Sequence, residues 1–254
     1  DYGGYLDSIE KFDLGINVAG MVGHTAVRYY VMGERSVEEL ATDEEIQQMA
    51  EIVGESMDSG AVGFSTNRYP PHVGPDGRSI PGTYAEAKEL LEIAKVVGQK
   101  RGLMQNVLDF GGQPEFSVNL LKDMASTTGD RILFSIGAGP DPASGKGVRN
   151  LLKELCKDGG DITGISQPRS SGFMFGLQSG LPFPGETWEK LRQMNLELRL
   201  SSIRDPEFRN KLIEEASSNQ ESIPYNQVFW LGNGETPDYA AGREKCIAEI
   251  AKEK

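Results

Sequence analysis

The chain has 254 residues and a formal net charge of −12, with 38 acidic side chains against 26 lysines and arginines. The acidic residues are spread along the chain and there is no basic run, so nucleic acid is not expected as a partner. No apolar run approaches the ~18 residues that a membrane span needs, and the length suits one α/β barrel or two smaller domains.

Two strand–helix units are predicted in the first hundred residues. The apolar stretch 16–23 (INVAGMVG) is typical of a buried strand, and Thr42 with Glu45 forms a capping box at a helix start. A second strand is predicted at 61–66, and after a long Pro/Gly-rich loop a further Thr/Glu pair predicts a helix that opens at Thr83. Because a βα loop usually has about 2–6 residues, this loop is more typical of a substrate lid or wall than of a spacer.

Three more units follow with the same rhythm. A strand is predicted at 103–108, before a helix that starts at Pro114. Further strands are predicted at 131–136 and 161–167, with a helix over 148–156 between them. Five consecutive βα units require a parallel sheet with right-handed crossovers. The alternation alone leaves a closed barrel and an open doubly wound sheet as alternatives.

The strand–helix rhythm ends after the fifth predicted strand. Residues 170–184 are rich in glycine and aromatic residues, and a helical pattern over 188–216 is interrupted at 204–206. A last helix is expected over 239–254. No interdomain linker stands out, so we expect a single domain across 1–254.

Polar side chains gather at or just past the predicted strand ends. The carboxyl ends of parallel strands meet at one edge of a sheet, where α/β enzymes place their substrates. We expect these side chains to converge on one concavity, and the alternative is that they scatter into solvent and local turns. The candidate substrate-binding residues are His24, Asn67, Arg68, Tyr69, Gln105, Asp109, Gln167 and Arg169.

Several of these candidates also have a purely structural interpretation. His24 could shuttle a proton or orient another group, or it could hydrogen-bond the loop backbone. Gln105 could line a pocket or bind barrel layers together. Arg68 and Arg169 could hold a carboxylate or another anionic group, or be structural. His72, in the long loop, is more typical of a surface histidine.

Motifs for metal binding and nucleophilic catalysis are missing from the sequence. It contains no HxH, HExxH, CxxC or GxSxG, and its two histidines, His24 and His72, lie far apart. We therefore expect no metal ligands in this chain, and its catalytic residues are unknown. Cys156 and Cys246 lie in stretches of helical pattern, where we expect small core residues of a cytoplasmic protein.

Two segments, GINVAGMVGHTAVR and GAVGFSTNRYPP…PGTYA, resemble the D-aminoacylase (N-acyl-D-amino-acid deacylase) branch of the amidohydrolase superfamily. Members carry an NVAxLVGH strand and later GAxGxSTGxxYPP, with YA opening the next helix. The resemblance runs in order from residue 1 to about 167, and the later LGNGETPDY is similar to less-studied amidohydrolases. It implies an incomplete parallel (β/α) barrel of TIM type, about strands three to seven of eight. The first strands, the last strand and the family's β-sandwich would be absent, as in an internal fragment.

The resemblance also implies features of a site. Tyr69 matches the tyrosine of the YPP motif and would contact substrate, whereas Asn67 stands where the motif has glycine. The metal-binding histidines of barrel strands five and six correspond to Val107 and Ile136, which cannot ligate a metal. Zinc or another divalent metal is therefore expected in the full-length protein, and none in this chain alone.

Two functions remain open at this point. The first is a metal-dependent hydrolase of C–N (amide) bonds, with N-acyl-D-amino acids as candidate substrates, of which this chain is a part that is inactive alone. The alternative is a catalytically silent amidohydrolase-like binding or scaffold protein. In both cases we expect a small-molecule ligand and no membrane. We also expect association into a homo-oligomer, because an open parallel sheet leaves edges and an apolar face uncovered.

Overall fold

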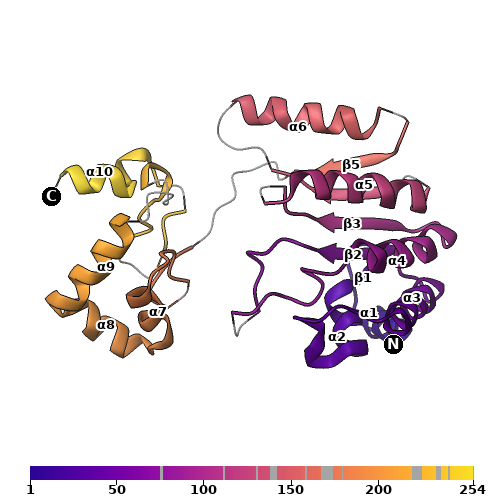
Figure 1. Cartoon of the computed structure of the whole chain (residues 1–254), viewed down its shortest axis with the longest axis horizontal. Helices are drawn as coiled ribbons and strands as arrows, with labels where there is room; N and C mark the ends of the chain where they lie inside the picture. Colours follow the sequence, from indigo (N-terminus) through magenta and orange to yellow (C-terminus); the bar gives the residue numbers. More distant parts are fainter. Residues whose placement is uncertain are drawn as a thin grey trace. The chain divides into compact units, whose positions relative to one another are not determined.

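The structure is a computed structural model that divides the chain into two compact units, Asp1–Arg169 and Ser170–Lys254. The five-stranded sheet lies in the first unit (Figure 1). The described residues are 1–74, 77–110, 112–129, 131–137, 142–157, 159–166, 174–178, 180–218, 225–232, 236–239 and 241–253, with the side chains of 142–144 excepted.

The first unit is built on a parallel sheet. Its strands are β1 (Met21–Gly23), β2 (Gly63–Asn67), β3 (Leu103–Val107), β4 (Ile132–Ser135) and β5 (Ile162–Ile165). They pair in chain order and every pairing is parallel, which confirms the predicted arrangement. A doubly wound sheet reverses its strand order at a switch point, so pairing in chain order favours part of a (β/α) barrel.

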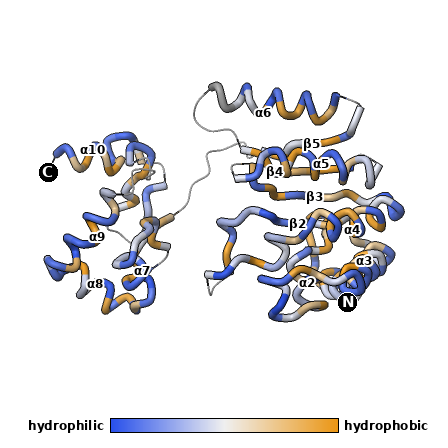
Figure 2. The backbone as a smooth tube through the Cα atoms, in the orientation of Figure 1, coloured by the Kyte–Doolittle hydropathy of each residue, from blue (hydrophilic) through white to orange (hydrophobic). Residues whose placement is uncertain are grey.

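Helices pack against one face of this sheet. They are α2 (His24–Met32), α3 (Asp43–Asp58), α4 (Ala87–Gln99), α5 (Pro114–Thr128) and α6 (Pro142–Leu155), with α1 (Tyr2–Glu10) before β1 and the 3-10 helix η1 (Gly33–Ser36) after α2. Phe64, Met104 and Phe134 point toward the helices and are fully buried in the core. Because side chains alternate along a strand, Ser65 and Gln105 point to the other, open face. In Figure 2, α6 alternates between hydrophilic and hydrophobic residues, as an amphipathic helix does.

Local signals fix several helix ends. Thr42 and Glu45 form the predicted capping box of α3, in which each side chain accepts a hydrogen bond from the backbone N–H of the other. Gly129 ends α5 in the left-handed conformation, with φ of 71°. The predicted helix start at Thr83 is wrong, because the Thr83 hydroxyl bonds within its own loop turn and α4 begins at Ala87.

The first strand is shorter than its apolar stretch predicts. It begins at Met21, while Ile16 is 75% exposed and Val18 is 48% exposed. In the described part of the chain β1 is an edge strand that pairs with β2 alone. Met21 is in register with Gly63, the first residue of β2, and the Gly20 carbonyl still accepts a hydrogen bond from the Val62 backbone N–H. Ile16 and Val18 therefore lie beyond the start of the neighbouring strand, although their side chains are apolar.

The described part of the second unit is mainly helical. It contains α7 (Glu186–Gln193), α8 (Leu196–Arg204), α9 (Pro206–Ser218), α10 (Ile247–Lys252) and the 3-10 helices η2 (Tyr225–Gln227) and η3 (Arg243–Lys245). Asp205 separates α8 from α9, which confirms the predicted break. The Glu215 carboxylate of α9 accepts hydrogen bonds from the backbone of Thr187 and Trp188, and so ties α9 to the start of α7. The last helix is shorter than predicted, because a bridge between Phe229 and Cys246 precedes it.

Both cysteines are free thiols. Cys246 is buried, as predicted, whereas Cys156 is exposed just beyond the end of α6. The core prediction is wrong for Cys156, because the buried face of α6 ends with Leu155.

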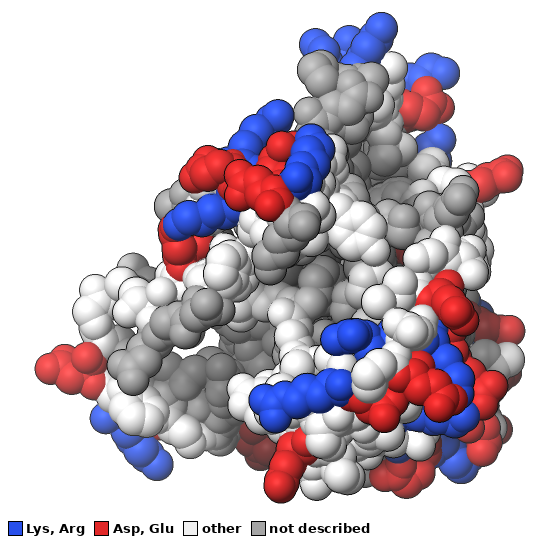
Figure 3. Space-filling view, turned by 90° about the vertical axis from the view of Figure 1, so that its left-hand side faces the viewer, with Lys and Arg blue, Asp and Glu red and all other residues white. Residues whose placement is uncertain are grey.

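One face of the molecule carries charged side chains of both signs (Figure 3). Acidic and basic side chains are interspersed over the face drawn in Figure 3. Among the described residues, no helix combines the length and the apolar character needed to cross a membrane.

Candidate functional site

Asn67, the last residue of β2, meets Tyr69 and His72 in the turn that follows the strand. This turn opens the rim loop, our name for residues 68–86 between β2 and α4, of which 68–74 and 77–86 are described. Asn67 Oδ1 accepts a hydrogen bond from the Tyr69 backbone N–H (2.9 Å), and the Asn67 amide nitrogen hydrogen-bonds His72 Nδ1. The Tyr69 and His72 rings meet edge to face with centroids 5.2 Å apart. Three side chains that can contact a ligand are thus gathered at the carboxyl end of β2.

Arg68 holds the two ends of the rim loop together. Its guanidinium donates to the Ala85 carbonyl and lies over the Phe116 ring, with 5.0 Å between Cζ and the ring centroid. Burial lowers the pKa of Arg68, and the negative charge of Glu89 opposes that shift. The side chain still carries its charge at neutral pH. These contacts give Arg68 a role in shaping the loop.

A row of polar side chains crosses the open face of the sheet. Ser65 Oγ donates to Gln105 Oε1 (2.6 Å), and Gln105 Nε2 donates to Ser135 Oγ (3.4 Å). Ser65 and Gln105 are register partners on β2 and β3, so the row spans three neighbouring strands. All three side chains are half-buried or exposed, which leaves them within reach of a polar ligand. In a closed barrel this face lines the interior.

His24 lies on the opposite face, between the sheet and the helices. It is 1% exposed, with Nδ1 hydrogen-bonded to Thr66 Oγ1 (2.8 Å) and Nε2 to Glu89 Oε1 (2.6 Å). Its partners are side chains and not loop backbone. Because protein encloses the ring, this position suits orienting other groups and gives no surface for direct contact with substrate.

Glu89 supplies the negative charge of this cluster. Its Oε1 also accepts from Arg28 Nε (2.9 Å), and the other nitrogens of Arg28 donate to the carbonyls of Ser36 and Glu39. Burial alone raises the pKa of the Glu89 carboxyl, but the hydrogen bonds and charges of His24 and Arg28 outweigh burial and lower it. We call this cluster the buried network, and its members are Thr66, His24, Glu89 and Arg28.

Asp109 lies in the turn after β3. Its Oδ1 accepts from the Gly112 backbone N–H (2.8 Å), and its backbone carbonyl accepts from Ser117 Oγ (2.9 Å) at the start of α5. Gln167 and Arg169 lie outside the described residues and stay predictions. The structure therefore brings Asn67, Arg68 and Tyr69 together at the start of the rim loop, places Gln105 in the row on the open face, and places His24 and Asp109 in contacts within the protein.

Arg28, Glu89 and Ser135 were not singled out from the sequence. Arg28 and His24 lie four residues apart, on one face of α2, and Glu89 lies four residues before the fully buried Ile93. A carboxylate on the buried face of a helix requires a partner, so the helical pattern did carry a signal for Glu89. A single serine in a strand such as Ser135 gives no comparable signal.

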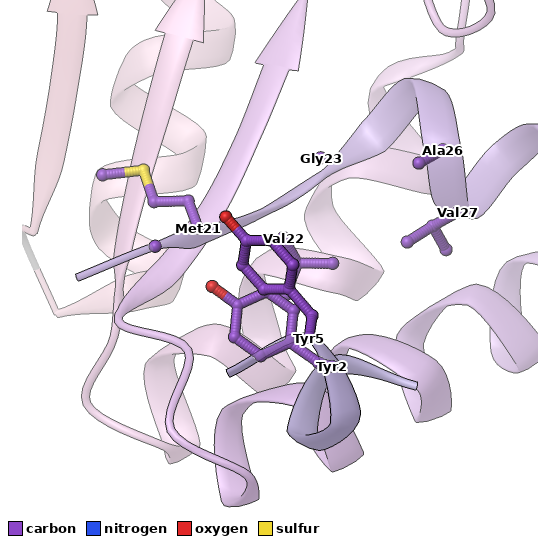
Figure 4. A pocket seen from close by; sticks show the side chains of 8 residues that line it. Tyr2, Tyr5, Met21, Val22, Gly23, Ala26 and Val27 are labelled. Atoms are coloured by element: carbon purple, nitrogen blue, oxygen red, sulfur yellow. The ribbon is translucent and has the colours of Figure 1, made fainter. Parts of the chain in front are cut away.

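A separate concavity of about 400 Å³ lies beside β1 (Figure 4). Its walls are two tyrosines of α1, the segment 20–23, and Ala26 and Val27 of α2. The rings of Tyr2 and Tyr5 lie 5.6 Å apart beside the strand. None of its described lining residues is charged or is one of the candidates, so the rim of β2 and β3 remains the candidate site.

The described residues do not fit a zinc site. Val107 ends β3 and Ile136 follows β4, at the positions where the resemblance implies histidines. Val107 is in register with Ser135 on the open face, whereas Ile136 packs against the core. No group of three His, Cys, Asp or Glu side chains that could hold a metal occurs in the described ranges. Zinc takes nitrogen, sulfur and carboxylate ligands, which this pair of aliphatic residues does not offer.

The parallel sheet, its helical layer and the polar residues at its carboxyl edge define the class of protein as part of a (β/α) barrel. Sequence comparison shows which proteins the chain is similar to. D-aminoacylase of Alcaligenes xylosoxydans xylosoxydans is 33% identical over 99 residues, which cover 39% of this chain and 18% of that protein. An uncharacterized protein of Mycobacterium tuberculosis is 26% identical over 112 residues, covering 41% of this chain and 18% of that protein. No family model matches the sequence.

Solved structures show the same fold. A D-aminoacylase described as defining a novel subset of amidohydrolases superposes with a TM-score of 0.55 at 22% identity, covering 66% of this chain and 34% of that one. The N-acyl-D-glutamate deacylase of Bordetella bronchiseptica was solved with zinc and a phosphonate inhibitor. It superposes with a TM-score of 0.53 at 23% sequence identity, and the match covers 65% of this chain and 33% of that one. The resemblance to D-aminoacylase-like amidohydrolases is thus confirmed in sequence and in fold. The chain spans about a fifth of the length of the curated relatives it matches (18%).

Proposed function

We propose that this chain is part of a metal-dependent amidohydrolase-like hydrolase that acts on C–N (amide) bonds, with N-acyl-D-amino acids as its substrate class. The observation that carries the proposal is the 33% identity to D-aminoacylase over 99 residues. The shared fold with a deacylase of N-acyl-D-glutamate supports it. The proposal includes a small-molecule substrate, a cytoplasmic location and association of copies into a homo-oligomer.

In this proposal the chain supplies a wall of the substrate site. Asn67 and Tyr69 at the start of the rim loop and Gln105 on the open face are the proposed substrate contacts. Amide and phenol groups can donate hydrogen bonds to the acyl carbonyl and the carboxylate of an N-acyl amino acid. His24 takes a positioning role, because it is enclosed by protein. The remaining candidates for the same rim are Arg68, Asp109, Gln167 and Arg169.

A catalytically silent binding or scaffold protein is the second candidate function. The observation that favours it is the pair Val107 and Ile136 at the carboxyl ends of β3 and β4. A complete set of metal ligands for a hydrolase would need residues from outside the described ranges. If the complete protein also lacks them, only binding remains.

Metal content and activity of the full-length gene product separate these two functions. The purified protein is analysed for zinc and assayed for release of free amino acid from N-acetyl-D-amino acids, with the L enantiomers as control. The hydrolase requires activity on the D series that a chelator abolishes and added zinc restores. A protein that binds these compounds without zinc and without turnover would instead support the silent alternative.

A further inference from the structure

The buried network joins three elements that are distant in sequence. Glu89 comes from α4, His24 from α2 and Thr66 from β2, with separations of 65 and 42 residues along the chain. His24 is the central member, because each of its ring nitrogens has one of these partners. The 2.8 Å contact with Thr66 has the usual length of a hydrogen bond, and the 2.6 Å contact with Glu89 is slightly shorter. The imidazole is therefore fixed in position and in the plane of its ring.

Gly82 is the point at which the rim loop rests on this ring. Its φ is +98°, and a Cβ built on it would lie 2.6 Å from His24 Nδ1 and 2.9 Å from Cε1. Beside it, Thr25 Oγ1 donates to the Pro81 carbonyl (3.0 Å). The closing half of the loop is thus in direct contact with the imidazole, with no space for a side chain between them.

We propose that His24, held by Glu89 and Thr66, is a positioning residue that seats the rim loop at the carboxyl edge of β2. Thr66 is followed directly by Asn67, and Arg68 donates to the Ala85 carbonyl on the closing side of the loop. Fixing the closing side on His24 therefore fixes the turn that carries Asn67 and Tyr69. The effect of this contact on substrate binding rests on the proposed function, whereas the contact between His24 and the rim loop does not.

Two glycines of the rim loop provide a matched test. Gly82 and Gly77 both have a left-handed φ, +98° and +81°, so alanine carries backbone strain at either position. Among the described residues, a Cβ at Gly77 meets nothing within 4 Å, whereas one at Gly82 meets the imidazole. Comparison of Gly82→Ala with Gly77→Ala therefore isolates the contact with His24.

The readouts are imidazole NMR and amide hydrogen exchange on the 254-residue chain. The chain has two histidines, and a His72→Gln variant assigns their signals. We expect a solvent-protected ring N–H of His24 in the wild type and in Gly77→Ala, which Gly82→Ala shifts or loses. Exchange in the rim loop should rise about tenfold in Gly82→Ala, with exchange in α3 unchanged, because opening is local. Equal behaviour of the two alanine variants in both readouts would overturn the proposal.

Thr66 gives a second test if Gly82→Ala does not fold. Thr66→Val removes the hydroxyl that holds His24 Nδ1 and keeps the branched shape of the side chain. We expect the same change in the ring signal and in rim-loop exchange, and we expect Thr66→Ser to restore the wild-type behaviour. A Thr66→Val chain with wild-type signals would refute the proposal that His24 positions the rim loop. Neither readout uses a substrate, so this failure is distinct from failure of the proposed hydrolase.

Discussion

Glu89 and Arg28 form an ion pair of 2.9 Å in which both side chains are 2% exposed. Two further hydrogen bonds from Arg28 go to the carbonyls of Ser36 and Glu39, which are neutral. Glu89 is therefore the carboxylate that compensates this buried guanidinium. Removing one partner of such a pair leaves an uncompensated charge in the interior, which costs much more than the loss of one hydrogen bond.

We expect Glu89→Gln to lower the free energy of unfolding by about 3–5 kcal/mol, the usual cost of breaking a buried ion pair. Urea denaturation of the wild type and the variant measures this difference. Glu92→Gln is the matched control on the same helix, because Glu92 and its partner Lys95 are 39% and 55% exposed. The control should stay within about 0.5 kcal/mol of the wild type. Similar stability of the two variants would show that the buried pair contributes little.

The same carboxylate should give the chain an acid-sensitive stability. The pKa of Glu89 in the folded chain is lowered from its ordinary value of 4.5: burial raises it, but the contacts with His24 and Arg28 prevail. A group with a depressed folded pKa stabilises the fold above its unfolded pKa, and this stabilisation is lost as pH falls through the folded pKa. We expect the free energy of unfolding to fall below about pH 4.5, with a smaller slope in Glu89→Gln. Parallel pH profiles of the two chains would contradict this assignment.

The sheet could be predicted because its signals are local. Apolar runs bounded by glycines located β2 to β5, and the Thr42 and Glu45 pair located α3. The start of β1 could not be predicted in this way, because Ile16 has the side chain of a strand but, in the parallel register, lies beyond the start of β2. The predicted start of α4 at Thr83 was wrong because the Thr83 hydroxyl donates to the Ile80 carbonyl in the folded loop and does not cap the helix.

The candidate site was only partly accessible from the sequence. Asn67, Tyr69 and Gln105 could be predicted as site residues because they lie at or near strand ends, and parallel topology places those ends at one edge of the sheet. The same reasoning predicted His24 as a site residue, but the position of a residue along a strand does not show which face of the sheet its side chain occupies. Glu89 shows the limit most clearly, since its partner His24 lies 65 residues away along the chain. Only tertiary packing brings the two together.

Gln105 is the sharpest test of the open face as a substrate site. In the full-length protein, Gln105→Ala should lower kcat/KM on an N-acyl-D-amino acid about tenfold, the effect of losing one hydrogen bond to the substrate. Gln47→Ala serves as control, because Gln47 lies on the exposed face of α3 and donates to Glu51. Steady-state kinetics of both variants give the comparison. Wild-type kcat/KM in Gln105→Ala would remove this residue from the proposed site.

The last prediction concerns the missing metal ligands. After dialysis, we expect the wild-type chain to hold no stoichiometric zinc. Val107 and Ser135 are register partners on the open face of adjacent strands, whereas Ile136 packs against the core. Histidines at Val107 and Ser135 would thus converge, and the double variant Val107→His with Ser135→His should bind zinc about tenfold or more tightly than the wild type, with binding lost as acid protonates the imidazoles.

Val107→His with Ile136→His is the matched control for this engineered pair. It adds the same two imidazoles but directs one of them into the core, so we expect little gain in zinc affinity. Isothermal titration with zinc at neutral and at acid pH measures all three chains. Equal affinity of the two double variants would contradict the register argument. Stoichiometric zinc in the wild-type chain that disappears on replacing His24 or His72 would show instead that this part of the barrel carries its own metal ligands.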